Sequence, residues 1–419
     1  MRQPPAPISI EEARAIVRAN VKCGPVETVP LLEAVGRVAA RNLVSDIDVT
    51  PFDDSAMDGF ALRSADLARA CPDAPVMLTC VAHIGAGDVY PATLQAGQCA
   101  RIMTGACMPD GADAVVKLEQ AAWTGEGVTG DAISFTAPVK PGANIRFAGD
   151  EAKAGDAVVF AGDTITAAGA GLLAACGNLT AQVYAKPVVG LISIGSELVD
   201  AGEVPGRGMI RNSNIWAMQA YVAAAGGVAR VYPTVPDDAD AIREVFLQAA
   251  GECDAVVSTG GACLGDYDLT PGVLMELGTM LFERVNVKPG KSQPFGLIGG
   301  KPVFVLSGNP AASSMGFELY VRLALRVMQG YRDLERPLVR ARITADVRKH
   351  DPRVFLDRAI LTRGADGSHQ VTLLKNQSSG VFGALQRCNC FAVIPKGLGG
   401  LAKGDEVTCL VYADEGLPF

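Results

Sequence analysis

The sequence is poor in aromatic residues and poorer still in histidine. Aromatic residues make up 6% of the chain, and only 3 histidines occur among its 419 residues. His83, His350 and His369 lie far apart and outside any ligand motif, which disfavours a zinc site. Any bound metal is then expected to be Mg²⁺ held by carboxylate oxygens.

Long apolar runs and an excess of positive charge are also missing. No apolar run reaches the roughly 18 residues that a membrane span needs, and the first residues, MRQPPAPISIEEA, contain no apolar signal core. The formal net charge of −8 argues against nucleic acid as the main partner. We therefore expect a cytoplasmic protein that binds neither membrane nor nucleic acid, and in which local basic groups hold any anionic ligand.

The cysteines form no C-x-x-C pair. There are 11 of them, an odd number, scattered along the chain and mostly set among apolar residues. This pattern favours buried free thiols in a reducing compartment over metal ligation or a disulfide framework.

Apolar residues and glycine, by contrast, are abundant. The chain is 49% hydrophobic with 47 glycines and is 20% charged, which indicates a globular protein rich in turns. Its length exceeds what one core supports. Changes of pattern along the chain predict a discontinuous N-terminal α/β domain (1–50 and 150–185), an inserted β-rich domain (51–149), an α/β domain (186–330) and a small C-terminal β-domain (331–419).

The N-terminal half predicts a helix from Ile10 capped by Ser9, a strand over 41–49 and a helix over 164–176. Short strands separated by Gly and Pro turns fill the insertion. It carries two polar motifs, 51–61 with Asp58 and 101–106 with Thr104. Asp58-Gly59 could be a simple hairpin turn, but three acids and a serine in six residues are dense for one.

Strands and helices alternate from residue 186 to about 328. This alternation predicts a doubly wound, mostly parallel sheet with helices on both faces. Such sheets bind ligands beyond the carboxyl ends of their strands. Four suggestive loops lie at those ends, and they contain Glu197, Thr259-Gly260-Gly261, Lys288 and Gly308-Asn309.

The stretch 255–291 concentrates this chemistry. A buried strand runs into the turn Thr259-Gly260-Gly261, where glycine allows close approach to a ligand. Two acids follow, then a helix capped by Thr270 and a second strand over 281–287 that leads to Lys288-Pro289-Gly290-Lys291. Either half alone could be an ordinary turn. Together they predict a site for an anionic ligand with a metal ion.

The last domain predicts strands over 339–347, 354–362, 370–374, 390–394 and 406–412. Its suggestive features are Arg353, Arg358 and the segment 376–380. Taken alone, these are expected to be surface residues.

Five motifs taken in order are more specific than any one of them. They are SAMDGFA at 55–61, RIMTGA with GADAVV at 101–116, GSEL at 195–198, STGG at 258–261 with Asp268, and KPGK at 288–291. Together the motifs resemble the molybdenum insertase family, the molybdopterin molybdenumtransferases called MoeA in bacteria and homologous to the E domain of gephyrin. The resemblance covers essentially the whole chain.

The resemblance implies an L-shaped homodimer of four-domain subunits that inserts molybdenum from molybdate into adenylylated molybdopterin and releases AMP. Its active sites would be built across the dimer, with Asp58 of one chain facing the partner's sheet rim. Transient contacts with the pterin adenylyltransferase and with recipient molybdoenzymes are compatible with it.

The family's functional positions can be carried over residue by residue. The catalytic set falls on Asp58, Thr104, Glu151, Glu197, Asp237, Asp268, Lys288 and Lys291. The substrate-binding set falls on Thr259, Gly260, Gly261, Cys263, Arg284, Ser307, Gly308, Asn309, Arg358 and Ser379. Glu197 and Asp268 would hold Mg²⁺, which could polarise a pyrophosphate group, while lysine and arginine bind oxyanions.

Four departures from the family pattern bear on this interpretation. Asp150-Glu151 replaces Glu-Asp, Cys263 stands where serine is usual, SQP after Lys291 reads as an insertion of two residues, and Ser307 replaces proline. Because three of them surround the expected oxyanion pocket, a paralogue specialised for tungstate is one alternative. A non-catalytic pterin carrier or scaffold is another, although the retained carboxylates and lysines favour the enzyme.

Overall fold

The computed structural model describes residues 5–262, 269–397 and 399–411. It divides into two compact units, one formed by residues 28–183 and the other by residues 1–27 with 184–419. Within the described residues, no helix combines the length and the apolar character that crossing a bilayer requires.

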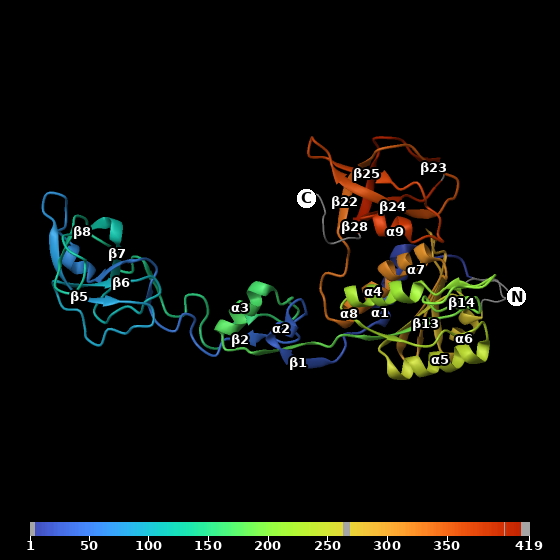
Figure 1. Ribbon diagram of the computed structural model, residues 1–419, viewed down its shortest axis with the longest axis horizontal. Helices are drawn as coiled ribbons and strands as arrows, with labels where there is room; N and C mark the ends of the chain where they lie inside the picture. The colour runs from blue at the N-terminus through green and yellow to red at the C-terminus, as the bar shows by residue number, and fades with distance from the viewer. Residues whose placement is uncertain (1–4, 263–268, 398, 412–419) are drawn as a thin grey trace. The chain divides into compact units, whose positions relative to one another are not determined.

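A mostly parallel six-stranded sheet forms the centre of the second unit (Figure 1). Its strand order is β16 (Val228–Val231), β13 (Val188–Ser193), β17 (Ala255–Thr259), β21 (Lys301–Leu306), β20 (Ser292–Ile298) and β18 (Thr279–Arg284). The first four strands are parallel, and β20 is antiparallel to both of its neighbours. The predicted doubly wound α/β fold is confirmed.

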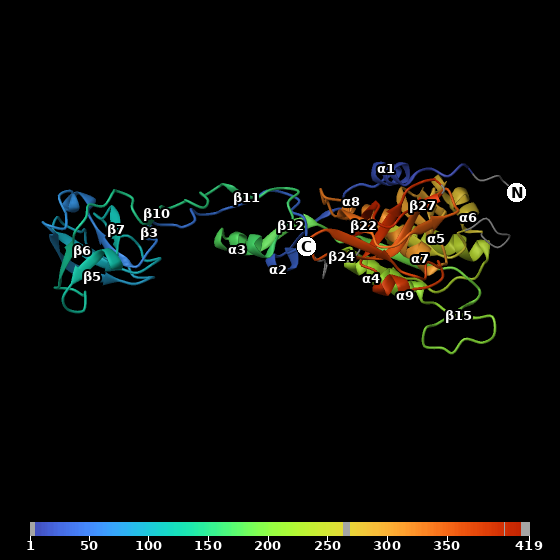
Figure 2. The same cartoon turned by 90° about the horizontal axis from the view of Figure 1, so that it is seen from above.

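Helices cover both faces of this sheet. On one face α5 (Ala239–Glu252) and α6 (Thr270–Leu277) pack against one apolar cluster. On the other lie α1 (Ile10–Asn20), α4 (Asn214–Ala224), α7 (Pro310–Gly316), a π-helical turn (Phe317–Val321) and α8 (Arg322–Met328). In Figure 2, the segment around β15 (Ile210–Arg211), which pairs with β14 (Leu198–Val199), projects as a loop.

Local signals account for the ends of the helices in two cases and fail in a third. Ser9 caps α1 in a capping box with Glu12, as predicted. Gly278 ends α6, also as predicted. Thr270, however, is the first helical residue of α6 and not its cap, because Leu269 takes the cap position without a side-chain bond.

The predicted strand over 281–287 is wrong as one strand. β18 ends at Arg284, and Val287–Lys288 form a separate strand, β19. The break occurs where Ile8 forms a parallel β-bridge with Val285. Ile8 N donates to the Arg284 carbonyl, and Asn286 N donates to the Ile8 carbonyl. β19 then pairs with the C-terminal domain, so the chain changes sheets between these two strands.

The C-terminal domain is a small closed barrel. The ring consists of β24 (Val354–Arg363), β25 (His369–Leu373), β22 (Leu338–Ile343), β28 (Glu406–Val411) and β26 (Cys390–Ile394), which returns to β24. Closure leaves few free strand edges. The predicted strand over 339–347 is two strands, because β22 ends at Ile343 and β23 (Val347–Lys349) pairs with β27 (Gly399–Leu401). The short helix α9 (Gly383–Arg387) was not predicted.

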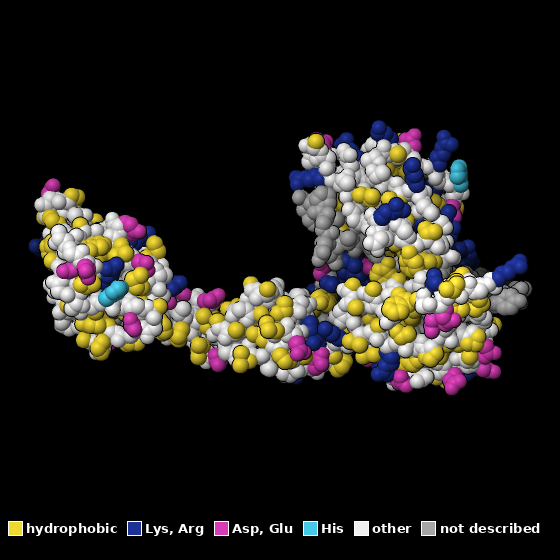
Figure 3. Space-filling model, viewed as in Figure 1, with side chains coloured by type: hydrophobic (Ala, Val, Ile, Leu, Met, Phe, Trp, Pro, Cys, Tyr) yellow, Lys and Arg dark blue, Asp and Glu magenta, His cyan; other side chains and the backbone are white. Residues whose placement is uncertain are grey.

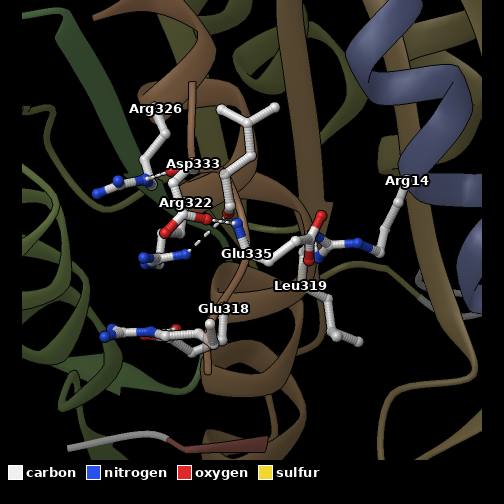
Figure 4. A network of polar contacts seen from close by, with 9 residues as sticks. Arg14, Glu318, Leu319, Arg322, Arg326, Asp333 and Glu335 are labelled. Carbon is white, nitrogen blue, oxygen red and sulfur yellow. Dashed lines mark hydrogen bonds and ion pairs between the residues drawn. The ribbon is translucent and has the colours of Figure 1, made fainter. Parts of the chain in front are cut away.

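The segment that joins the α/β domain to the barrel is held by arginines (Figure 4). Arg14 of α1 donates to the carbonyl of Leu319 at 2.6 Å and pairs with Glu335 at 2.5 Å. Arg322 and Arg326 donate to the carbonyls of Leu334 and Asp333. Since Arg14, Arg322 and Arg326 bind Glu335, Leu334 and Asp333, the connecting segment after α8 is held against the helices of the α/β domain.

The other unit contains two sub-structures. The N-terminal segment contains β1 (Val26–Pro30), α2 (Leu31–Ala34), α3 (Ala167–Ala175) and β12 (Thr180–Tyr184). Two antiparallel pairs follow toward the insertion, β2 (Leu43–Val44) with β11 (Ala157–Val159) and β3 (Asp54–Ser55) with β10 (Ile145–Arg146). The strand predicted over 41–49 is therefore only two residues long.

The β-rich insertion is a six-stranded mixed sheet. Its order is β7 (Ala114–Lys117), β4 (Gly59–Leu62), β6 (Gln98–Ile102), β5 (Val76–Ile84), β9 (Ala132–Phe135) and β8 (Ala121–Trp123). Two apolar clusters pack on it, one around Phe60 and one around Ile102. Asp58 precedes β4 and Thr104 follows β6, so neighbouring strands deliver both residues.

Candidate functional site

A cavity of about 620 Å³ opens where the α/β domain meets the barrel. Three segments line it. The end of β18 and the segment that follows it contribute Arg284, Lys288, Pro289, Gly290, Lys291 and Ser292. The segment after β21 contributes Ser307, Asn309 and Ala312, and the barrel contributes Arg353, Gln377, Ser378 and Ser379. Six of the residues expected at the site are thus brought together: Arg284, Lys288, Lys291, Ser307, Asn309 and Ser379.

β19 explains how two domains build one cavity. Val287 and Lys288 pair in parallel with Val354 and Phe355 at the start of β24. This ladder carries the Lys288–Lys291 segment out of the central sheet and against the barrel. Arg353 immediately precedes β24 and donates from Nη1 to the Val287 carbonyl at 3.4 Å, so its place in the cavity follows from the same pairing.

The cavity wall is strongly cationic. Among the described residues, no carboxylate forms an ion pair with Arg284, Lys288 or Lys291. Arg353 differs, because its Nε lies 2.9 and 3.1 Å from the two carboxylate oxygens of Asp351. Arg353 and, more weakly, Lys288 hold the pKa of Asp351 well below its usual range. The described residues that line the cavity include four basic side chains and no acidic one, which suits an anionic ligand.

The barrel side of the cavity is a loop fixed by hydrogen bonds. The Gln377 side chain accepts from Arg358 N at 3.0 Å and donates to Arg358 O at 2.8 Å. The Ser379 carbonyl accepts from Ala311 N at 2.8 Å. The Ala311 amide at the start of α7 therefore already has a hydrogen-bond acceptor within the protein.

Arg358 lies behind this wall and does not line the cavity. Its side chain is fully buried, and Nη2 donates to the Ser378 carbonyl at 3.1 Å. Nε and Nη1 are buried without a hydrogen-bond partner among the described residues. Burial lowers the pKa of the guanidinium.

The two glycine turns lie next to each other. Gly260 has φ +97°, and a Cβ added there would stand 2.0 Å from the Ile194 carbonyl oxygen. A Cβ on Gly308 would stand 3.5 Å from the Gly260 Cα. Thr259 is buried at the end of β17, and its carbonyl accepts from Ile194 N. Thr259, Gly260, Gly261 and Gly308 lie outside the lining of the cavity.

Glu197 and Asp237 occupy neighbouring loops of the sheet rim. Asp237 accepts from Ser196 N at 3.0 Å, and Asp237 N donates to Ser196 Oγ at 3.1 Å. The Glu197 carboxylate folds over Gly195, where an added Cβ would lie 2.4 Å from Oε2. The described residues contain no cluster of three or more metal-binding side chains. Cys263 and Asp268, the other expected residues of this rim, lie outside the described residues.

Asp58 and Thr104 meet in the β-rich insertion. Asp58 Oδ1 accepts from both the amide and the hydroxyl of Thr104, each at 2.7 Å. These two bonds lower the pKa of Asp58. Glu151 is exposed in a turn, whereas the preceding Asp150 accepts from Phe147 N at 2.8 Å. The shorter acid, Asp150, is therefore the one whose side chain stabilises the turn.

Sequence reasoning missed several lining residues. Arg353, Gln377 and Ser378 were expected to be surface residues, and Ser292 was noted only as part of a departure from the family pattern. No local pattern could have selected Arg353, because its place depends on a strand 66 residues earlier in the chain.

The fold and the cavity define a class of protein: multidomain α/β proteins with a cationic pocket between a doubly wound domain and a small β-barrel. The chain matches the family models of the MoeA N-terminal region (domain I and II) over residues 8–177, a probable molybdopterin binding domain over 190–327 and the MoeA C-terminal region (domain IV) over 340–412.

Relatives and solved structures agree with these matches. The chain is 33% identical over 406 residues to a molybdopterin molybdenumtransferase of Staphylococcus aureus, covering 97% of this chain and 96% of the relative. It is 34% identical over 407 residues to one of Staphylococcus epidermidis, with the same coverage. Two crystal structures of the molybdopterin biosynthesis MoeA protein of Pyrococcus horikoshii superpose with TM-scores of 0.83 and 0.82, at 29% and 31% identity, over 97% of this chain and 100% of each structure.

The chain therefore belongs to the MoeA family of molybdopterin molybdenumtransferases. It is a transferase of molybdenum cofactor biosynthesis.

Proposed function

We propose that this enzyme takes molybdate into the cavity between the α/β domain and the barrel and inserts the molybdenum into adenylylated molybdopterin, with release of AMP. One observation carries the proposal: Arg284, Lys288 and Lys291 converge on the cavity without carboxylate partners among the described residues. Molybdate is a tetrahedral dianion, and ammonium and guanidinium groups bind such oxyanions by charge-assisted hydrogen bonds. Ser307 and Ser379 add neutral polar groups to the same wall.

Mg²⁺ is proposed as the metal, held by Glu197 and Asp268. The donor chemistry supports this assignment, because Glu197 and Asp237 place carboxylate oxygens on adjoining loops of the sheet rim and Mg²⁺ prefers oxygen ligands. When bound, the ion would stabilise negative charge on a pyrophosphate group. Ser196 orients the Asp237 loop, and the lysines of the cavity neutralise the oxyanion.

A homodimer in the cytoplasm is proposed as the working form. Large apolar side chains are exposed in both units, with Leu32 at 83%, Leu179 at 76% and Trp216 at 64%. Hydrophobic side chains are visible over the segment that carries α2 and α3 (Figure 3). Patches of this kind commonly mark interfaces. All ten cysteines within the described residues are free thiols, which suits a reducing compartment.

The test is AMP release from adenylylated molybdopterin by the purified enzyme. We expect release to require molybdate and Mg²⁺ and to fall at least about tenfold in Lys291→Gln, because a desolvated charge-assisted contact is worth about 1.5–3 kcal/mol. Lys301→Gln is the matched control, since Lys301 begins β21 and pairs with Asp254 at 3.5 Å. Glu197→Gln should raise the Mg²⁺ concentration needed for half-maximal release.

Tight binding of the pterin without any AMP release would contradict the proposal and favour a carrier. If tungstate stimulated AMP release more than molybdate does, the type of reaction would stand, but tungstate would be its oxyanion substrate.

A further inference from the structure

An aromatic ring lies beside Lys288 of the cavity, and the proposed reaction does not use this ring. The Lys288 ammonium lies over the Phe355 ring, 4.6 Å from its centroid. This distance is within the range of a cation–π contact. The two residues are partners in the parallel ladder between β19 and β24, so the backbone fixes their separation. Phe355 is half-buried, whereas Lys288 is exposed.

A second ammonium group contacts the same ring. Lys349 Nζ lies 5.0 Å from the Phe355 centroid and also donates to the Pro395 carbonyl. Lys349 is buried, which lowers its pKa. Phe355 thus contacts one ammonium that is fixed in the protein and one that reaches the cavity.

An aromatic ring and a carboxylate can both hold a cation, but only the carboxylate offsets its charge. Asp351 holds Arg353 and offsets its charge, so this arginine brings less net charge to the cavity. The face of an aromatic ring attracts a cation through its quadrupole and carries no net charge. A long lysine side chain otherwise loses up to about 2 kcal/mol of rotamer freedom when a ligand fixes it. A cation that the ring holds before the ligand arrives has lost part of that freedom already.

We propose that Phe355 is a positioning residue for Lys288: it holds the ammonium group at the cavity through a contact that does not itself neutralise the charge. The inference rests on the proposed function, which makes this cavity the oxyanion site. It gives the barrel a specific role, because Phe355 is supplied by β24 while Lys288 is supplied by the α/β domain.

The test is calorimetric titration of the whole protein with sodium molybdate in a double-mutant cycle. Phe355→Leu should weaken molybdate binding roughly two- to fivefold, as expected for the loss of an exposed cation–π contact. Phe355→Tyr, which keeps the ring face, should bind like the wild type. In a Lys288→Gln background, Phe355→Leu should have no further effect. Phe382→Leu is the matched control, because Phe382 is a partly buried ring that packs on the main core.

The outcomes separate this inference from the function on which it rests. An equal loss on Phe355→Leu in both backgrounds, or the same loss in Phe382→Leu, would show a general packing effect and overturn the role of Phe355 alone. A Lys288→Gln variant that binds molybdate like the wild type would remove the cavity as the oxyanion site, and this inference with it.

Discussion

At the scale of the residue, the contact between Asp58 and Thr104 shows how hydrogen bonds from one neighbour act on a single carboxylate. Asp58 is exposed, yet one of its oxygens accepts two hydrogen bonds from Thr104. Both bonds favour the ionised carboxylate, and the amide is the stronger influence on the pKa of Asp58. Because the pKa in the folded protein is lowered, the stabilisation is present above the ordinary value of 3.8 and is lost as the pH falls through the folded value.

Thr104→Val tests this contact, since it removes the hydroxyl and keeps the amide and the shape. We expect the pKa of Asp58, followed by NMR titration of its carboxyl carbon, to rise toward 3.8 but to stay below it. Thr104→Ser is the control and should leave the pKa unchanged. An identical titration curve in Thr104→Val would mean that the hydroxyl does not act on Asp58.

At the scale of an element, the turn after β17 requires glycine at position 260 for its backbone conformation and because no side chain fits there. Gly260 has a positive φ, and the Ile194 carbonyl occupies the place that a side chain would need. Gly260 N also donates to the Leu306 carbonyl at 3.1 Å, which ties this turn to the end of β21. The turn after β17 can approach the Ile194 carbonyl, which follows β13, only with a residue that lacks a Cβ.

Gly260→Ala should lower the free energy of unfolding of the α/β domain by at least about 2 kcal/mol, because the strained backbone alone costs about 1–3 kcal/mol and the steric clash adds to it. Gly272→Ala in α6 is the control. Beyond the adjoining residues and backbone of α6, no atom of the described residues lies within 4 Å of the added Cβ there, and alanine in a helix gains about 0.5–1 kcal/mol over glycine. Calorimetric unfolding of both variants checks this, and equal transition temperatures would contradict it.

At the scale of the whole molecule, the two clusters of polar side chains belong to different compact units. The Asp58–Thr104 pair lies in the unit formed by residues 28–183, whereas the cationic cavity lies in the other unit. A polar cluster on a rigid scaffold more often serves a site than a fold. We expect Asp58 of one subunit to act with Lys288 of its partner in the proposed homodimer.

Coexpression of an Asp58→Ala chain with a Lys288→Ala chain tests this arrangement. With random pairing, about half of the dimers are mixed, and each mixed dimer keeps one intact site of two. The mixture should therefore recover roughly a quarter of the wild-type AMP release. If it is no more active than the single variants, each active site lies within one subunit.

Local signals in the sequence were sufficient for the elements that are stabilised by their neighbours along the chain. The Ser9 cap, the end of α6 at Gly278 and the buried strand β17 follow from capping chemistry and from apolar runs, which act over a few residues. The alternation of strands and helices likewise determined the doubly wound sheet, because such a pattern can bury its apolar faces in few other ways.

Only the tertiary structure decided which residues share the cavity. The chain leaves the central sheet after β18, and β19 pairs with β24 of the barrel. This pairing brings Arg353 into the wall and places Phe355 beside Lys288. Arg358 was expected to contact the substrate but lies buried behind the wall. Strands of different domains can pair only where each domain has an unpaired strand edge. The packing of the domains determines which edges stay unpaired, and the local sequence around Lys288 or Arg353 does not predict this.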